Sequence, residues 1–129
     1  LTAIEADDPS ALIGWAAQAT PARYAELAPV VFRVAAGGDL RANTLLAMAV
    51  EELVTHVRTL ARRLFVDERA AIPVALAGGL LQRGGPLRRR VEHRLKSAVP
   101  GAQVRQEDVD PARGAVRGAL RLLGVEMSS

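Results

Sequence analysis

The first third of the chain carries apolar residues at helical spacing, interrupted by signals that start and stop helices. Asp8-Pro9 combines a capping side chain with a proline, which needs no hydrogen bond at the first helical position, so a helix is predicted over residues 9–19. Thr20-Pro21 repeats this signal and predicts a second helix over residues 21–36, which Pro29 would kink.

A longer helix is predicted over residues 40–65. Gly37-Gly38 followed by Asp39 combines a helix stop with a new N-cap. The apolar positions beyond it are three or four residues apart over about five turns, as in an amphipathic helix with one buried face. They are Leu46, Val50, Leu53, Val57, Leu60 and Leu64, and the residues expected to face mostly outward are Glu51, Glu52, Arg58 and Arg62.

The second half of the chain has the pattern of alternating strands and helices. After a charged break at residues 67–69, the apolar run 72–77 ends at Gly78-Gly79 and predicts a buried strand of about five residues. Gly84-Gly85-Pro86 then predicts a helix that extends to about residue 99. Its expected inner face consists of Leu87, Val91, Leu95 and Ala98, and its expected outer face of Arg88, Arg89, Arg90 and Arg94.

The last segment predicts a second strand and a final helix. Residues 102–106 alternate like a half-buried strand, and Asp110-Pro111 starts a helix whose inner side carries Val116, Ala119, Leu120 and Leu123. Three helices followed by strand, helix, strand and helix make the predicted fold class a helix-rich α/β fold. The two strands should pair in parallel through a right-handed crossover, with the turn after Leu76 at the carboxyl edge, where ligands of open α/β sheets bind.

Length and pattern predict one domain that is part of a longer protein. The 129 residues, half of them apolar, are enough for a single compact domain over the whole of 1–129. Two strands alone make a poor sheet, so we expect further strands from elsewhere in a longer chain or from a partner. The first residue is Leu1, and residues 1–5 resemble the middle of a helix, which again predicts a fragment.

Composition argues against several classes of site. Without cysteine these residues hold no disulfide framework, thiolate nucleophile or cysteine-ligated metal, which is compatible with the cytoplasm. No segment has the roughly 18 uninterrupted apolar residues of a membrane helix. The net charge of +3 is small and is weak support for a nucleic-acid partner. His56 and His93 lie on different helices without a ligand set, and neighbouring Glu51 and Glu52 point about 100° apart, so neither a metal site nor a catalytic carboxylate pair is expected.

Two glycine-containing elements are the candidates for ligand binding. At Gly78-Gly79 the buried strand runs into a turn that can expose backbone N–H groups, so adenosine or phosphate could lie against it, although a simple tight turn explains the same residues. Gly114-Ala115 would let the N-terminus of the last helix, with its partial positive charge, come close to that turn. Small residues there could also serve only the packing of helix against strand.

These two elements occur in the same order as in a known family, after a matching helical segment. Residues 24–31 (YAELAPVV) and 35–42 (AAGGDLRA) resemble the aromatic-Ala and Gly-Asp-x-x-Ala helix pair of the BadF/BadG/BcrA/BcrD ATPase family, which includes N-acetylglucosamine kinases. Residues 74–81 resemble its adenosine-motif strand and Gly-Gly turn, and residues 111–115 resemble its closing proline and Gly-Ala helix. The resemblance extends from about residue 12 to residue 122.

The resemblance implies the second lobe of an actin-like (ribonuclease H-like) ATPase that binds ATP. Ala25 would contact the adenine ring, Gly78 and Gly79 would flank the adenosine and α-phosphate, and Gly114 with Ala115 would support the pocket. The catalytic base, the phosphate loop and most Mg²⁺ contacts would come from a first lobe absent from these residues. The fragment alone should therefore be inactive, while the full-length protein would be an ATPase or would phosphorylate an amino sugar such as N-acetylglucosamine. A homodimer is compatible with the family.

Two alternatives remain open. Members of the family that activate dehydratases or reductases hold an iron–sulfur cluster with cysteines, and the absence of cysteine disfavours that branch. Outside the family, the chain could be a helical interaction module in which Gly78-Gly79 is only a turn and the arginine face over residues 88–94 binds an acidic partner or nucleic acid. No aromatic residue interleaves with these arginines, which disfavours binding of single-stranded nucleic acid.

Overall fold

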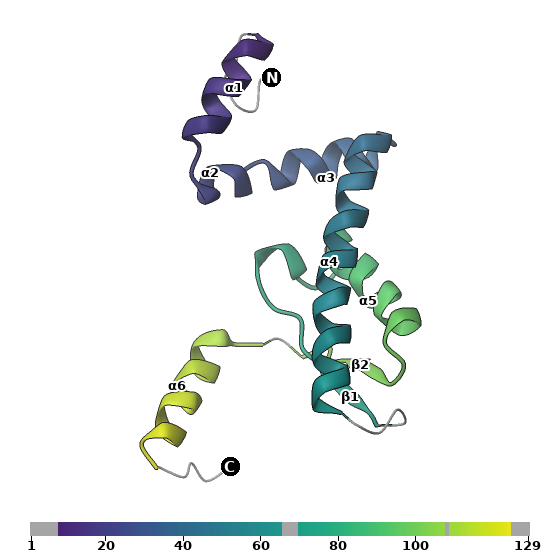
Figure 1. Cartoon of the computed structure of the whole chain (residues 1–129), viewed down its shortest axis with the longest axis vertical. Coiled ribbons are helices and arrows are strands. Elements are labelled where there is room, and N and C mark those ends of the chain that lie inside the picture. The colour runs from purple at the N-terminus through teal and green to yellow at the C-terminus, as the bar shows by residue number, and fades with distance from the viewer. Residues whose placement is uncertain (1–7, 66–69, 108, 125–129) are drawn as a thin grey trace. The chain divides into compact units, whose positions relative to one another are not determined.

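The computed structural model describes residues 8–65, 70–107 and 109–124. Within these ranges it contains helices and two short strands (Figure 1): α1 (Pro9–Gln18), α2 (Pro21–Ala25), α3 (Ala28–Ala36), α4 (Leu40–Leu64), β1 (Ile72–Val74), the 3-10 helix η2 (Gly79–Leu81), α5 (Pro86–Ala98), β2 (Ala102–Val104) and α6 (Pro111–Leu122). The chain divides into two compact units, Leu1–Met48 and Ala49–Ser129, and each is described by itself. The patterns noted at residues 1–5 and 67–69 lie outside the described residues.

The first unit begins with two helices that are capped as the sequence predicts. Side-chain oxygens of Asp8 and Thr20 accept hydrogen bonds from backbone N–H groups in the first turns of α1 and α2. The rings of Trp15 and Tyr24 meet edge to face with their centroids 5.2 Å apart. The Tyr24 hydroxyl also donates to the carbonyl of Ala16 at 2.7 Å. These contacts hold α1 and α2 together.

The helix predicted over residues 21–36 is two helices in the structure. Helix α2 ends at Ala25 and α3 begins at Ala28, so a break replaces the predicted kink. A continuous helix would bring the ring of Pro29 against the carbonyl four residues earlier, that of Ala25, and proline has no N–H to donate to it. Pro29 instead occupies the first turn of α3, where no N–H is needed.

The junction between α3 and α4 confirms the predicted stop and start. Gly38 has a φ of 91°, in the left-handed region that favours glycine. The Asp39 carboxylate accepts from the N–H of Ala42 at 2.8 Å, as expected of an N-cap. The Asn43 side chain donates to the carbonyls of Ala35 and Asp39 at 2.8 and 2.9 Å, which ties the start of α4 to the end of α3.

Helix α4 is amphipathic, but its buried face is rotated from the predicted stripe. Val50 is buried as expected, whereas Leu60 and Leu64 are 55% and 71% exposed. Val54 and Ala61, outside the predicted stripe, are buried. The helix carries apolar residues on more than one side, so helical spacing alone fits two neighbouring faces and does not decide which of them packs.

The second unit contains a parallel sheet of two strands, as predicted. Ile72 pairs with Ala102 and Val74 with Val104, so the strands are in parallel register. Each strand has three residues, so both β1 and β2, the latter predicted over residues 102–106, are shorter than predicted. The described residues thus form a helix-rich α/β fold with a small parallel sheet.

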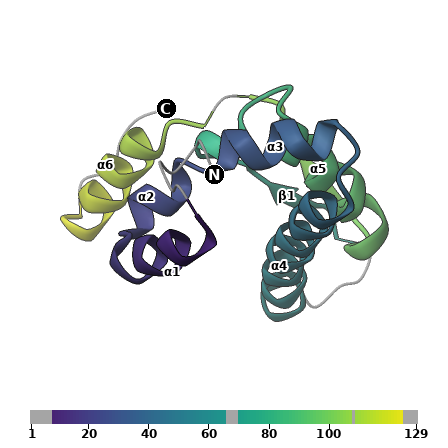
Figure 2. The same cartoon turned by 90° about the horizontal axis from the view of Figure 1, so that it is seen from above.

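Helix α5 lies beside the sheet and beside the second part of α4 (Figures 1 and 2). It contacts β2 and η2, and the Arg94 guanidinium forms an ion pair with Glu51 of α4. Leu87, Val91 and Leu95 of the predicted inner face are buried. The hydrophobic core of this unit also includes Val54, Val74, Leu76 and Val99.

Helix α6 starts where the sequence predicts, but its apolar side is not buried. The Asp110 carboxylate accepts from the N–H groups of Ala112 and Arg113 at 3.0 and 3.1 Å, which confirms the N-cap. Val116 and Leu123, which were expected to face inward, are 57% and 76% exposed. An amphipathic pattern shows that a helix has an apolar side, but it does not show what covers that side.

Candidate functional site

The turn after β1 takes its shape from the glycine pair. Beyond Val74, the last residue of β1, Leu76 is buried and the chain then turns at Gly78, whose φ of 106° and ψ of 160° are essentially restricted to glycine. Gly79 begins η2, in which the N–H of Leu81 donates to the carbonyl of Gly78 at 3.0 Å. The turn therefore lies beyond the carboxyl end of β1, as predicted.

The two glycines differ in what requires them. Gly78 needs glycine for its positive φ, whereas Gly79 does not have a positive φ and its backbone suits other residues as well. A Cβ atom placed on either residue would meet no atom within 4 Å. Neither backbone strain nor crowding by the described residues explains glycine at position 79. The turn presents an open surface that a flat ligand can approach closely.

Beside this turn lies Arg88, which contradicts the prediction that it faces outward. The residue is only 4% exposed, and its Nε donates to the Glu92 carboxylate at 2.7 Å. The prediction was wrong because helical spacing alone assigns a charged residue beside the inner face to the solvent side. Here Glu92, one turn away, pairs with Arg88 and allows it to be buried. The charge pair of Arg88 with Glu92 at i and i+4 is the one signal in the sequence that points to this arrangement.

The buried guanidinium of Arg88 also donates to three backbone carbonyls. Its Nη1 donates to Leu76 at 3.4 Å and to Leu81 at 3.3 Å, and its Nη2 donates to Arg105 at 3.0 Å. Leu76 and Leu81 bracket the glycine turn, and Arg105 follows β2. One side chain therefore connects the chain on both sides of the turn with the end of the neighbouring strand.

The second predicted element, Gly114-Ala115, lies near the start of α6, and both residues are exposed. A Cβ atom on Gly114 would meet nothing within 4 Å. Glycine inside a helix costs about 0.5–1 kcal/mol relative to alanine, and the described residues provide no packing reason for it. No hydrogen bond joins Gly114-Ala115 to the Gly78-Gly79 turn in the described part of the chain. Their role near that turn therefore stays a prediction.

Ala25, the predicted adenine contact, is the last residue of α2 and is exposed. It belongs to the first unit, whereas Gly78-Gly79 and Gly114-Ala115 belong to the second. A single site formed by all five residues therefore stays a prediction.

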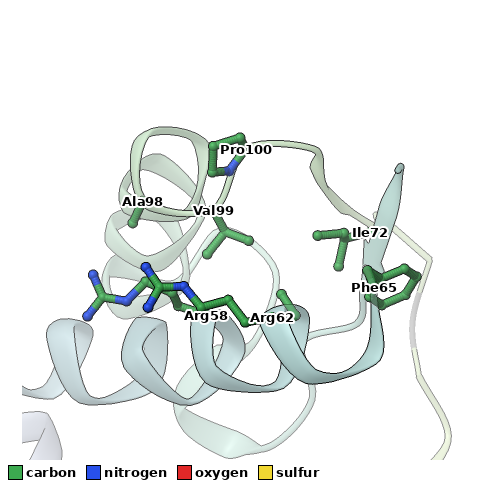
Figure 3. Close-up of a pocket in the computed structure, with 8 residues that line it drawn as sticks. Arg58, Arg62, Phe65, Ile72, Ala98, Val99 and Pro100 are labelled. Carbon is green, nitrogen blue, oxygen red and sulfur yellow. The ribbon is translucent and has the colours of Figure 1, made fainter. Parts of the chain in front are cut away.

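A pocket of about 360 Å³ lies at the other end of β1 (Figure 3). Arg58 and Arg62 of α4 extend along one side of it, below Ala98 and Val99. The remaining lining residues are Ala61, Phe65, Ile72 and Pro100. Ile72 is the first residue of β1, so this pocket and the glycine turn lie at opposite ends of the strand. None of the five predicted binding residues lines it.

The charged residues of the second unit offer little for other chemistry. Arg88 is buried and is therefore lost from the predicted arginine face, whereas Arg94 stays partly exposed and pairs with Glu51. Among residues 8–65, 70–107 and 109–124, no three His, Asp or Glu side chains gather in a way that could hold a metal ion. Within the same ranges, none of the helices combines the length and apolar character needed to span a bilayer.

Comparison with known proteins links the chain to a sugar kinase. It is 28% identical over 98 residues to an N-acetyl-D-glucosamine kinase from Dictyostelium discoideum. The match covers 76% of this chain and 31% of the kinase, so the chain spans about a third of the length of this relative. No protein-family model matches the chain, and no solved structure matches it significantly.

Proposed function

We propose that this chain is the nucleotide-binding lobe of an N-acetylglucosamine kinase-like enzyme, or of a related ATPase, of the BadF/BadG/BcrA/BcrD group with an actin-like fold. The adenosine and α-phosphate of ATP lie against Gly78 and Gly79. Ala25 contacts the adenine ring, and Gly114 with Ala115 supports the pocket. The similarity to a sugar kinase supports the reaction class.

The observation that carries the nucleotide site is a glycine at position 79, in the turn beyond the carboxyl end of β1, that neither strain nor crowding explains. Its backbone suits other residues, and a side chain there would point into open space. A ligand that must approach the backbone closely gives a reason for glycine at this position. The flat adenine ring and its ribose fit such a requirement, because any Cβ would hold them away from the turn.

We further propose that catalysis uses residues beyond those of this chain. In the part of the chain that the structure describes, no three His, Asp or Glu side chains gather in a way that could hold a metal ion such as Mg²⁺. In phosphoryl transfer the catalytic base and the metal ions act on the γ-phosphate and the acceptor hydroxyl. We assign these functions, and the recognition of an amino sugar such as N-acetylglucosamine, to another lobe of a longer cytoplasmic protein, which could form a homodimer. The match covers 31% of the kinase relative, as expected if this chain corresponds to one part of a longer enzyme.

Binding and turnover by the full-length protein test this proposal. Isothermal titration with a non-hydrolysable ATP analogue and Mg²⁺ should give a Kd in the range of about 1 μM to 1 mM that is common for enzyme substrates. A coupled assay should show ADP release that depends on N-acetylglucosamine. If the release of phosphate from ATP does not depend on the sugar, the ATPase branch is favoured.

The contrary results are equally specific. Absence of ATP binding in the full-length protein would remove the proposed function. A salt-sensitive affinity for DNA without ATP binding would support the helical interaction module in its place.

A further inference from the structure

We infer that Arg88 is a positioning residue of the nucleotide site, an inference that rests on the proposed function. Its guanidinium is buried and makes four hydrogen bonds, one to the Glu92 carboxylate and three to backbone carbonyls. Burying a guanidinium is unfavourable unless its donors are satisfied.

The three carbonyls come from three different segments. Leu76 precedes the glycine turn, Leu81 closes it, and Arg105 follows β2. Among the described residues, the turn itself is closed by one backbone hydrogen bond, from the N–H of Leu81 to the carbonyl of Gly78. Arg88 therefore fixes where the turn enters and leaves, and it fixes the turn relative to the neighbouring strand.

Arginine suits this task because its planar fork carries five N–H donors in fixed directions. Glu92, one helical turn further along α5, holds the Nε side of the fork at 2.7 Å. The Nη donors are then directed toward the three carbonyls. A lysine has three donors on a single nitrogen. It therefore reaches fewer of these carbonyls than arginine, whose donors are spread over three nitrogens.

Arg88 acts through the backbone and does not touch the nucleotide. Four of its donors are already bound to protein oxygens. Its effect is to keep Gly78 and Gly79 in the shape that accepts adenosine, so less ordering is required when the ligand binds. The neighbouring Arg89 is exposed and provides a matched control on the same helix.

The test compares Arg88→Met, Arg88→Lys and Arg89→Met in the full-length protein. We expect Arg88→Met to raise the KM for ATP about tenfold or more, and Arg88→Lys to raise it by less. The KM for the amino sugar should stay within about twofold of the wild-type value, because a local change at the turn does not alter sugar contacts. Arg89→Met should leave both constants unchanged.

Hydrogen exchange separates positioning from a general loss of stability. In Arg88→Lys the amide of Leu81, whose hydrogen bond to the Gly78 carbonyl closes the turn, should exchange faster, while the amides of α4 remain protected. Faster exchange throughout the second unit would show a purely structural role and overturn the inference. So would an unchanged KM for ATP in a folded Arg88→Met or, if that variant does not fold, in Arg88→Lys. Absence of ATP binding by the wild-type protein would instead overturn the proposed function.

Discussion

Two glycine turns at opposite ends of the small sheet differ in why they contain glycine. Gly101, between α5 and β2, has a φ of 84°, and a Cβ there would collide with the carbonyl oxygen of Ala70. Its own carbonyl accepts the N–H of Ile72 at 2.8 Å, beside the first residue pair of the sheet. Gly79, beyond the other end of β1, has neither a positive φ nor a neighbour that a Cβ would meet.

This difference separates structural glycines from a glycine that needs another explanation. The fold itself accounts for Gly101, since both its backbone conformation and its surroundings exclude a side chain. Gly78 is intermediate, because its backbone requires glycine while its surroundings do not. At position 79, neither the backbone conformation nor the surroundings require glycine. The proposed ligand supplies the missing reason, and substitutions at these glycines should therefore affect different properties.

The largest effect on stability is expected at Gly101. Gly101→Ala combines an unfavourable φ with a backbone collision and should lower the free energy of unfolding by about 3 kcal/mol or more. Urea denaturation followed by circular dichroism measures this change. A loss below about 0.5 kcal/mol, the size of an ordinary surface substitution, would show that the turn has room for a side chain.

Gly78→Ala should have a smaller effect on stability. The φ of 106° and ψ of 160° are strained for alanine, but the new methyl group meets no neighbour. The expected loss is about 2 kcal/mol, within the range for one residue in a disfavoured backbone region. The same denaturation experiment tests it. A loss as large as that of Gly101→Ala would mean that backbone strain accounts for both losses and that the collision at Gly101 adds nothing.

Gly114→Ala tests the second glycine element, and its effect on stability should be smaller than that of Gly78→Ala and opposite in sign. Alanine is the better helix former, so α6 should become more stable by about 0.5–1 kcal/mol. If the start of α6 supports the nucleotide pocket, the KM for ATP should rise a few-fold at the same time. Hydrogen exchange of the α6 amides and steady-state kinetics provide the two readouts. A more stable helix with unchanged KM would remove Gly114 from the site.

Local signals in the sequence predict much of this fold. Proline, aspartate and glycine at helix ends act through the nearest few residues, so the caps at Asp8, Asp39 and Asp110 and the stop at Gly38 could be predicted. The inner face of α5 could be predicted because it has one unambiguous apolar side. The position of the glycine turn after a short strand follows from the same local pattern.

Other features depend on partners that are distant in the sequence. The carbonyl of Arg105 lies 17 residues from Arg88, and no periodicity reveals that one accepts a hydrogen bond from the other. The buried side of α4 is set by the elements that pack on it, so Val54 was missed. The reason for glycine at position 79 could not be decided from sequence, because a tight turn and a ligand surface use the same residues.

The most direct test of the nucleotide site is the affinity of the full-length protein for ATP after substitution of Gly79. Gly79→Ala and Gly79→Val should change the free energy of unfolding by no more than about 0.5 kcal/mol, because the new side chains meet no neighbour. Titration with a non-hydrolysable ATP analogue should show a Kd that rises with side-chain size, about tenfold or more for valine. An unchanged Kd for folded Gly79→Val would contradict the account, because adenosine could not then lie against this turn.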